Sequence, residues 1–185
     1  MRKGKCKIIG NHIGTFTELR IEKLISIWVD GIHRGFIMPK ILVIYDSRTG
    51  NTEKLAQAVA DGARKVPGTS VEMRKVREIN LEEVAAADAY AFGSPSHFSI
   101  MSGEILTMIT NLYPHRDKLA GKPACVFTTG SGGQVSALEN IEKIIGVFNP
   151  KFIKPGLAIE GSPKAIDKEQ AEKLGKKLAN AITKK

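Results

Sequence analysis

The sequence has few cysteines and no long apolar run, and each shortage excludes a class of protein. Its two cysteines, Cys6 and Cys125, stand in no metal-binding or redox spacing, which argues against a disulfide framework or a zinc site. No apolar run approaches the roughly 18 residues of a transmembrane helix, and charged residues interrupt any secretory signal. We therefore expect a cytoplasmic protein with no membrane span and no bound metal.

Acidic residues are also scarce, which leaves a formal net charge of +9. A basic surface favours anionic nucleotides or acidic partner proteins through electrostatic steering. Nucleic acid is not an expected partner, because the sequence carries no recognition motif and no stripe of basic and aromatic residues.

Residues 1–37 differ in pattern from the rest of the chain. They are basic, and Met38 stands directly before the first strand-like segment. We expect residues 1–37 to be an N-terminal extension upstream of the native start, and residues 38–185 to form one domain. The alternative is a docking helix that uses Trp28. Its apolar residues at helical spacing would be Ile21, Leu24, Ile25, Trp28 and Ile32.

From residue 38 onward, strand-like and helix-like segments alternate five times. This alternation predicts an α/β fold, a doubly wound five-stranded parallel sheet with helices on both faces. In the strand order 2-1-3-4-5, ligands bind outside the carboxyl ends of strands one and three. The strands are expected at 40–45, 70–75, 89–93, 122–128 and 152–159. The helices are expected at 52–65, 81–87, 102–112, 135–146 and 167–182.

The first loop with ligand-binding character joins the first expected strand to the first expected helix. Backbone N–H groups at such a helix start point at one spot and favour an anion, and hydroxyl side chains add donors. Gly50 lets the backbone approach the anion or take positive φ. The alternative is that the loop binds no ligand and is only the Ser/Thr-capped start of a helix that follows a strand. The expected phosphate-binding residues are Ser47, Arg48, Thr49, Gly50, Asn51 and Thr52.

Two common phosphate loops do not match this segment, since both need further glycines and only Gly50 is present. The segment resembles the flavodoxin phosphate loop, written Ser/Thr-x-Thr-Gly-x-Thr, at every fixed position. The resemblance extends over residues 39–182. It implies a flavodoxin-like sheet in the short-chain layout, with FMN as the cofactor and its phosphate in this loop.

The second loop follows the third expected strand, over residues 93–104. It resembles the Gly-Ser/Thr-Pro-x-Tyr-Phe-x-x-Met-Ser segment of the flavodoxin-like quinone reductases known as the WrbA group. His97 stands where that group has Tyr. It is either a proton donor or substrate contact, or a surface histidine without a role. The residues expected to contact the flavin ring are Ser94, Pro95, Ser96, His97 and Phe98.

The third loop follows the fourth expected strand. Taken alone, it is a flexible glycine-rich turn. The flavodoxin resemblance implies that it lies along the pyrimidine and ribityl parts of the flavin. Loops after strands one, three and four converge in such a sheet. The third set of expected contacts is Thr128, Thr129, Gly130, Ser131, Gly132 and Gly133.

The resemblance implies an FMN-binding redox protein that transfers electrons through the flavin to a redox partner protein. The alternative is an NAD(P)H-dependent quinone or FMN reductase of the WrbA type, which would form a homo-oligomer. Residues 93–103 and 127–138 contain no Asp or Glu, and the third loop has no aromatic residue, which would leave one flavin face open to a nicotinamide. Arg48 either holds a nucleotide phosphate or is a surface residue. A second alternative is a flavin-free binding module, because a fold does not prove a function.

Overall fold

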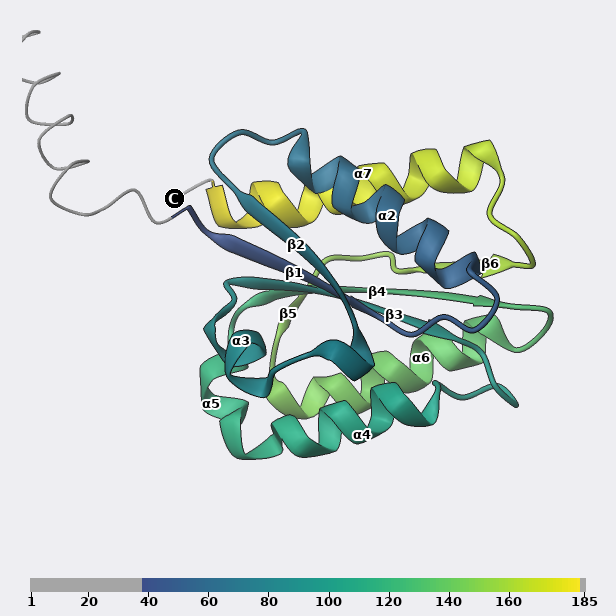
Figure 1. The fold of residues 1–185 in the computed structure, drawn as a ribbon, viewed down its shortest axis with the longest axis horizontal. Helices are drawn as coiled ribbons and strands as arrows, with labels where there is room; N and C mark the ends of the chain where they lie inside the picture. Colours follow the sequence, from purple (N-terminus) through teal and green to yellow (C-terminus); the bar gives the residue numbers. More distant parts are fainter. Residues whose placement is uncertain (1–37, 184–185) are drawn as a thin grey trace, which may run out of the picture. The chain divides into compact units, whose positions relative to one another are not determined.

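The computed structural model describes residues 38–183, so the expected extension over residues 1–37 lies outside the described part of the chain. In this part a parallel sheet is covered by helices on both faces (Figure 1). The strands are β1 (Lys40–Tyr45), β2 (Ser70–Lys75), β3 (Ala89–Pro95), β4 (Pro123–Gly130), β5 (Lys151–Phe152) and β6 (Leu157–Glu160). The α-helices are α2 (Asn51–Arg64), α3 (Leu81–Ala86), α4 (Gly103–Leu112), α5 (Arg116–Leu119), α6 (Gln134–Ile145) and α7 (Ala165–Thr183).

The centre of the sheet is β1, which is paired in parallel with β2 on one side and with β3 on the other. Its residues from Ile41 to Tyr45 are all buried and apolar or aromatic. A strand with helices on both faces needs no alternation of polar and apolar residues. The continuous apolar run is therefore the reason that this segment forms the central strand.

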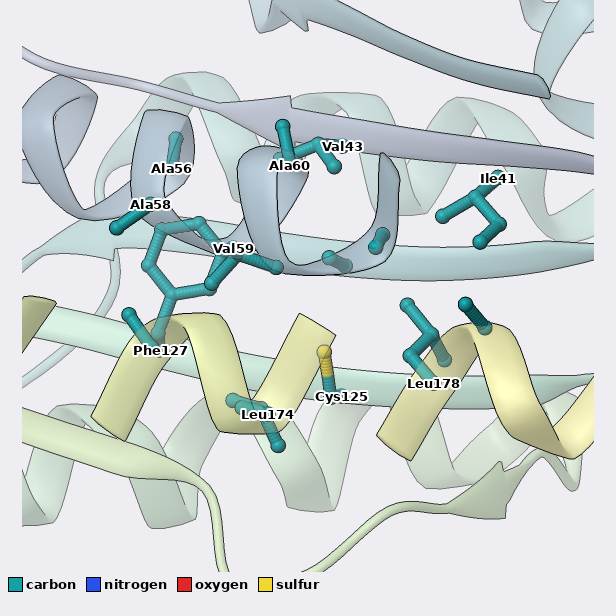
Figure 2. Close-up of a cluster of buried hydrophobic side chains, with 14 of the residues drawn as sticks. Ile41, Val43, Ala56, Ala58, Val59, Ala60, Cys125, Phe127, Leu174 and Leu178 are labelled. Carbon is teal, nitrogen blue, oxygen red and sulfur yellow. The ribbon is translucent and has the colours of Figure 1, made fainter. Parts of the chain in front are cut away.

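Two hydrophobic cores lie on opposite faces of the sheet. On one face, α2 and α7 lie side by side and cover β1, β3 and β4 (Figure 1). Figure 2 shows Val59 of α2 and Leu174 of α7 in this core, with Phe127 of β4. α4 and α6 cover the other face, where Phe92 and Ile141 are buried. Helix-spaced apolar residues thus place α2, and with it the loop before it, against the central strands.

The helices α2 and α7 cross at two glycines. A Cβ atom built at Gly62 would collide with the backbone of Glu172, and one at Gly175 with the carbonyl of Val59. Only glycine allows this close approach at both positions. The crossing fixes α2 at its carboxyl-terminal half and leaves its amino terminus at the ligand edge of the sheet.

The expected single strand over residues 152–159 was wrong, because the structure divides it into β5 and β6. Both pair in parallel with β4, and Ile153 N–H still donates to the Ala124 carbonyl at 2.8 Å. Pro155 has no N–H and cannot continue the ladder. The strand order is therefore β2-β1-β3-β4 with β5 and β6 sharing the outer edge of β4.

The other expected strands and helices are confirmed with small shifts at their ends. β3 and β4 each run two residues further than expected, since Ser94 pairs with Thr128 and Pro95 with Thr129. The short helix α5 was not expected. Cys125 is fully buried, and the described residues hold no cluster of metal ligands. Among residues 38–183, no helix has the length and apolar character to cross a membrane.

Candidate functional site

The carboxyl ends of β1, β3 and β4 lie at one edge of the sheet, and the three expected ligand loops meet there (Figure 1). They enclose a pocket of about 350 Å³, which we call the candidate site. This volume falls within the roughly 300–1,000 Å³ of small-molecule sites. Its lining residues are Arg48, Thr49, Asn51, Pro95, Ser96, His97, Thr129, Gly130, Ser131 and Gly161.

The first loop ends where α2 begins. Gly50 precedes the helix with φ 84°, and its N–H donates to Ser47 Oγ at 3.1 Å. The first bond within the helix runs from Lys54 N–H to the Gly50 carbonyl at 3.0 Å. In the described chain no side chain caps α2. The N–H groups of its first turn are therefore available to an anion, and Thr49 and Asn51 line the pocket beside them.

A hydroxyl pair joins the first loop to the third. Thr52 Oγ1 and Thr129 Oγ1 are 2.8 Å apart, and the two residues are only 1% and 4% exposed. The Thr52 side chain is therefore engaged within the protein, whereas Thr129 also lines the pocket. This bond fixes the start of α2 against the end of β4.

The second loop is held by bonds to its neighbours. Ser94 is buried and accepts the Ser102 N–H at 2.9 Å, which ties β3 to the start of α4. Ser96 N–H donates to the Thr129 carbonyl at 2.7 Å, and Ser96 Oγ donates to the Gly132 carbonyl at 3.2 Å. Because the Ser94 side chain is turned into the protein, only backbone atoms of this residue can serve a ligand. Pro95, Ser96 and His97 line the pocket.

Phe98 lies at the tip of a tight turn. His97 and Ile100 exchange two backbone hydrogen bonds of 2.9 and 3.1 Å, and Phe98 and Ser99 between them have φ of 52° and 65°. Phe98 is 100% exposed and does not line the pocket. The Phe98 ring, which was expected to give the flavin a flat contact, therefore lies outside the lining of the candidate site.

The third loop packs closely on the second. The buried Thr128 donates its hydroxyl to the Gln134 carbonyl at 2.8 Å, so its side chain faces the protein. A side chain at Gly130 would contact Ser96 at 2.8 Å, and one at Gly133, where φ is 68°, would collide with Ser99. Gly132 and Gly133 shape the loop without lining the pocket. Glycine is required where these two loops touch.

Two buried polar atoms among the described residues have no hydrogen-bond partner, His97 Nε2 and Gln134 Oε1. His97 lies in the second loop, and Gln134 is the first residue of α6, directly after the third loop. An unpaired buried polar atom costs about 1–3 kcal/mol. The lining set offers hydroxyls, an amide, an arginine and backbone groups, with no carboxylate. These residues fit a phosphate ester joined to a neutral ring, which is the chemistry of FMN.

The sequence interpretation missed Gly161, which follows β6 and lines the pocket. Its N–H donates to the Gly130 carbonyl at 2.7 Å, so the end of β6 joins the third loop. The sequence feature that could have identified this residue is its place, as a glycine directly after a parallel strand. Since parallel strands end at the same edge, this position belongs to the ligand edge.

The sequence of this chain is similar to those of known proteins. The flavodoxin family model matches residues 43–175. A flavodoxin from Aquifex aeolicus is 34% identical over 162 residues, covering 78% of this chain and 88% of the relative. An NAD(P)H dehydrogenase (quinone) from Archaeoglobus fulgidus is 33% identical over 192 residues, covering 80% of this chain and 99% of the relative.

Solved structures share the fold. A flavodoxin from the domain Archaea superposes with a TM-score of 0.71 at 23% identity, covering 77% of this chain and 98% of that chain. A WrbA-like flavodoxin from Agrobacterium tumefaciens superposes with a TM-score of 0.69 at 21% identity, covering 79% of this chain and 98% of that chain. With the family match spanning most of the described sheet and all three loops, this chain belongs to the flavodoxin family.

Proposed function

We propose that this protein binds FMN at the candidate site and transfers electrons through the bound flavin. The observation that carries the proposal is the meeting of three loops around one pocket at the uncapped start of α2. Thr49, Asn51 and the first N–H groups of α2 would hold the phosphate. The backbone and side chains of the second and third loops would hold the ring system.

The protein contributes binding and orientation, while bound FMN supplies one-electron and two-electron redox chemistry. The pocket lining contains Arg48 and no Asp or Glu, so it adds no negative charge beside the flavin. Arg48 would stabilise a phosphate or a negatively charged flavin by its own charge. His97 would orient the ring through its imidazole.

A second function, NAD(P)H-dependent quinone or FMN reduction, is favoured by two observations. The Archaeoglobus fulgidus relative named as such a dehydrogenase aligns over 99% of its length. The pocket lining holds no Phe, Tyr or Trp side chain and no carboxylate, which leaves room for a nicotinamide. The partners are then NAD(P)H and a quinone, in place of a redox protein. In either case we propose a cytoplasmic location, and for the reductase a homo-oligomer.

An anaerobic titration of the FMN-loaded protein with NADPH and then NADH tests which function holds, with the flavin absorbance as readout. Rapid bleaching in one step supports the reductase. No bleaching by either nucleotide, followed by two resolved steps with dithionite, supports the electron carrier. A purified protein that is colourless and takes up no FMN would contradict both and favour the flavin-free binding module.

A further inference from the structure

Tyr45 and Glu53 face each other across the phosphate loop. Tyr45 is the last residue of β1, and Glu53 lies in the first turn of α2. The Tyr45 hydroxyl donates to Glu53 Oε1 at 2.8 Å. Residues 46–52 lie between these two positions, so the bond connects the strand before the loop to the helix after it.

Both ends of this connection are anchored in the fold. The Tyr45 ring is buried, with 3% exposure, and its backbone is paired with Lys75 of β2 and Gly93 of β3. Glu53 Oε1 also lies 3.7 Å from Lys75 Nζ. Within the loop itself, the described contacts are the bond between Gly50 N–H and Ser47 Oγ and the bond between Asp46 N–H and the Gly93 carbonyl. The hydroxyl bond therefore adds a link between strand and helix.

The same bond also positions the Glu53 carboxylate. A carboxylate in the first turn of α2 is attracted to the same helix end as a phosphate. Glu53 does not line the candidate site. It lines a separate groove of about 500 Å³ beside α2. Burial, aided by the Glu53 carboxylate, raises the pKa of Tyr45, so its hydroxyl keeps the proton that it donates.

We propose that Tyr45 and Glu53 are positioning residues that hold the phosphate loop in its anion-binding conformation and keep the Glu53 charge away from the anion. This inference rests on the proposed function, because the anion is taken to be the phosphate of FMN. Neither side chain lines the candidate site. The pair acts through the loop that it spans.

The test compares the dissociation constants of FMN and riboflavin, because riboflavin shares the ring system and lacks the phosphate. Fluorescence titrations are made on the apoprotein of the wild type, Tyr45→Phe, Glu53→Ala, Glu53→Gln and the double variant Tyr45→Phe/Glu53→Ala. The matched control is Tyr90→Phe. Tyr90 is also buried, and its hydroxyl donates to the Val84 and Ala87 carbonyls at 2.8 and 3.0 Å.

We expect Tyr45→Phe and Glu53→Ala each to weaken FMN binding about fivefold or more, as for a lost bond to a charged group. Riboflavin binding should stay within about twofold in both, since the loop serves the phosphate. The double variant should lose no more than the larger single loss, because one bond is removed in all three. Glu53→Gln keeps an acceptor oxygen and should lose less than Glu53→Ala. Tyr90→Phe should preserve the wild-type ratio of the two constants.

Equal weakening of FMN and riboflavin in Tyr45→Phe would overturn the inference, as would an unchanged FMN affinity. Equal losses in Glu53→Gln and Glu53→Ala with a silent Tyr45→Phe would assign the effect to the Glu53 charge, and would also overturn it. A wild-type protein that does not prefer FMN over riboflavin would instead contradict the proposed function. The two failures are therefore distinct.

Discussion

The hydroxyls of Thr52 and Thr129 share a buried hydrogen bond of 2.8 Å, although 77 positions separate the two residues along the chain. One residue lies in the first turn of α2 and the other near the end of β4. Each hydroxyl can donate and accept, so the pair is satisfied without a charged group. The bond joins two of the three loops through protein atoms alone.

Removing one member of this pair should destabilise the apoprotein. In Thr129→Val the Thr52 hydroxyl stays buried without its partner, which costs about 1–3 kcal/mol. Thr52→Val should have a similar cost, and the double variant should cost less than the sum of the two. Urea unfolding of the four proteins measures this cycle. Additive losses would show that the bond contributes nothing to stability.

The phosphate loop should lose its ligand when its backbone conformation and a hydroxyl are removed together. We expect Thr49→Val combined with Gly50→Leu to weaken FMN binding at least about tenfold, because Gly50 has φ 84° and Thr49 lines the pocket. Flavin titration is the measurement. An unchanged affinity would contradict the phosphate-loop assignment.

Gly68→Leu is the matched control for that variant. Gly68 has nearly the same φ, 82°, and a Cβ there also has no neighbour within 4 Å. It lies between α2 and β2, away from the candidate site. We expect a loss of stability from backbone strain, of about 1 kcal/mol, with unchanged FMN affinity.

The crossing of α2 and α7 should not tolerate a methyl group. We expect Gly175→Ala to destabilise the protein by about 1–3 kcal/mol, because the new Cβ would overlap the Val59 carbonyl. Gly146→Ala is the control. Gly146 has φ −53°, and a Cβ there meets nothing within 4 Å. Thermal unfolding compares the two variants. Equal melting temperatures would show that α2 and α7 can move apart to accommodate the methyl group at no cost in stability.

A charge cluster at the amino end of the sheet should make stability depend on acid pH. Lys40 Nζ lies 3.0 Å from Glu72 Oε1, and the hydrogen bond from Lys40 lowers the pKa of Glu72 below its usual value of 4.5. A lowered folded pKa stabilises the protein above the unfolded pKa. This stabilisation is lost as the pH falls through the folded pKa.

Glu72→Gln should therefore reduce the free energy of unfolding at pH 7 by up to about 1 kcal/mol, since the pair is partly exposed. The difference from wild type should shrink as the pH falls well below 4.5, where the wild-type carboxylate is itself protonated. Urea unfolding of both proteins, at pH 7 and at a pH well below 4.5, measures this difference in stability. Glu169→Gln on the exposed face of α7 is the control with a smaller expected change. A difference that is constant with pH would contradict the assignment.

The sequence predicted most of the fold because the strong signals are local. β1 is a continuous apolar run, and α2 has buried residues at helical spacing, so their bounds were confirmed within a residue. The division between β5 and β6 depends on which backbone groups reach β4, which is a tertiary property. Pro155 was the local sign of that break.

The candidate site was predicted at the level of loops and less well at the level of side chains. Which way Ser94 and Thr128 point depends on bonds to Ser102 and Gln134, which spacing alone does not reveal. The exposure of Phe98 depends on positive φ at two residues that are not glycine, a conformation rarely expected for a bulky side chain. The roles of the loops as FMN contacts stay predictions, to be tested by the titrations above.

The contact between α2 and α7 also has a consequence for folding during synthesis, because the two helices lie far apart in the sequence. The ribosome releases α2 early, and α7 follows every strand of the described chain. Until α7 is synthesised, the side of α2 that carries Val59 and Ala63 has no helix to cover it. A nascent chain therefore completes all three loops of the candidate site while the helix behind the first loop still presents an apolar face to water and to chaperones.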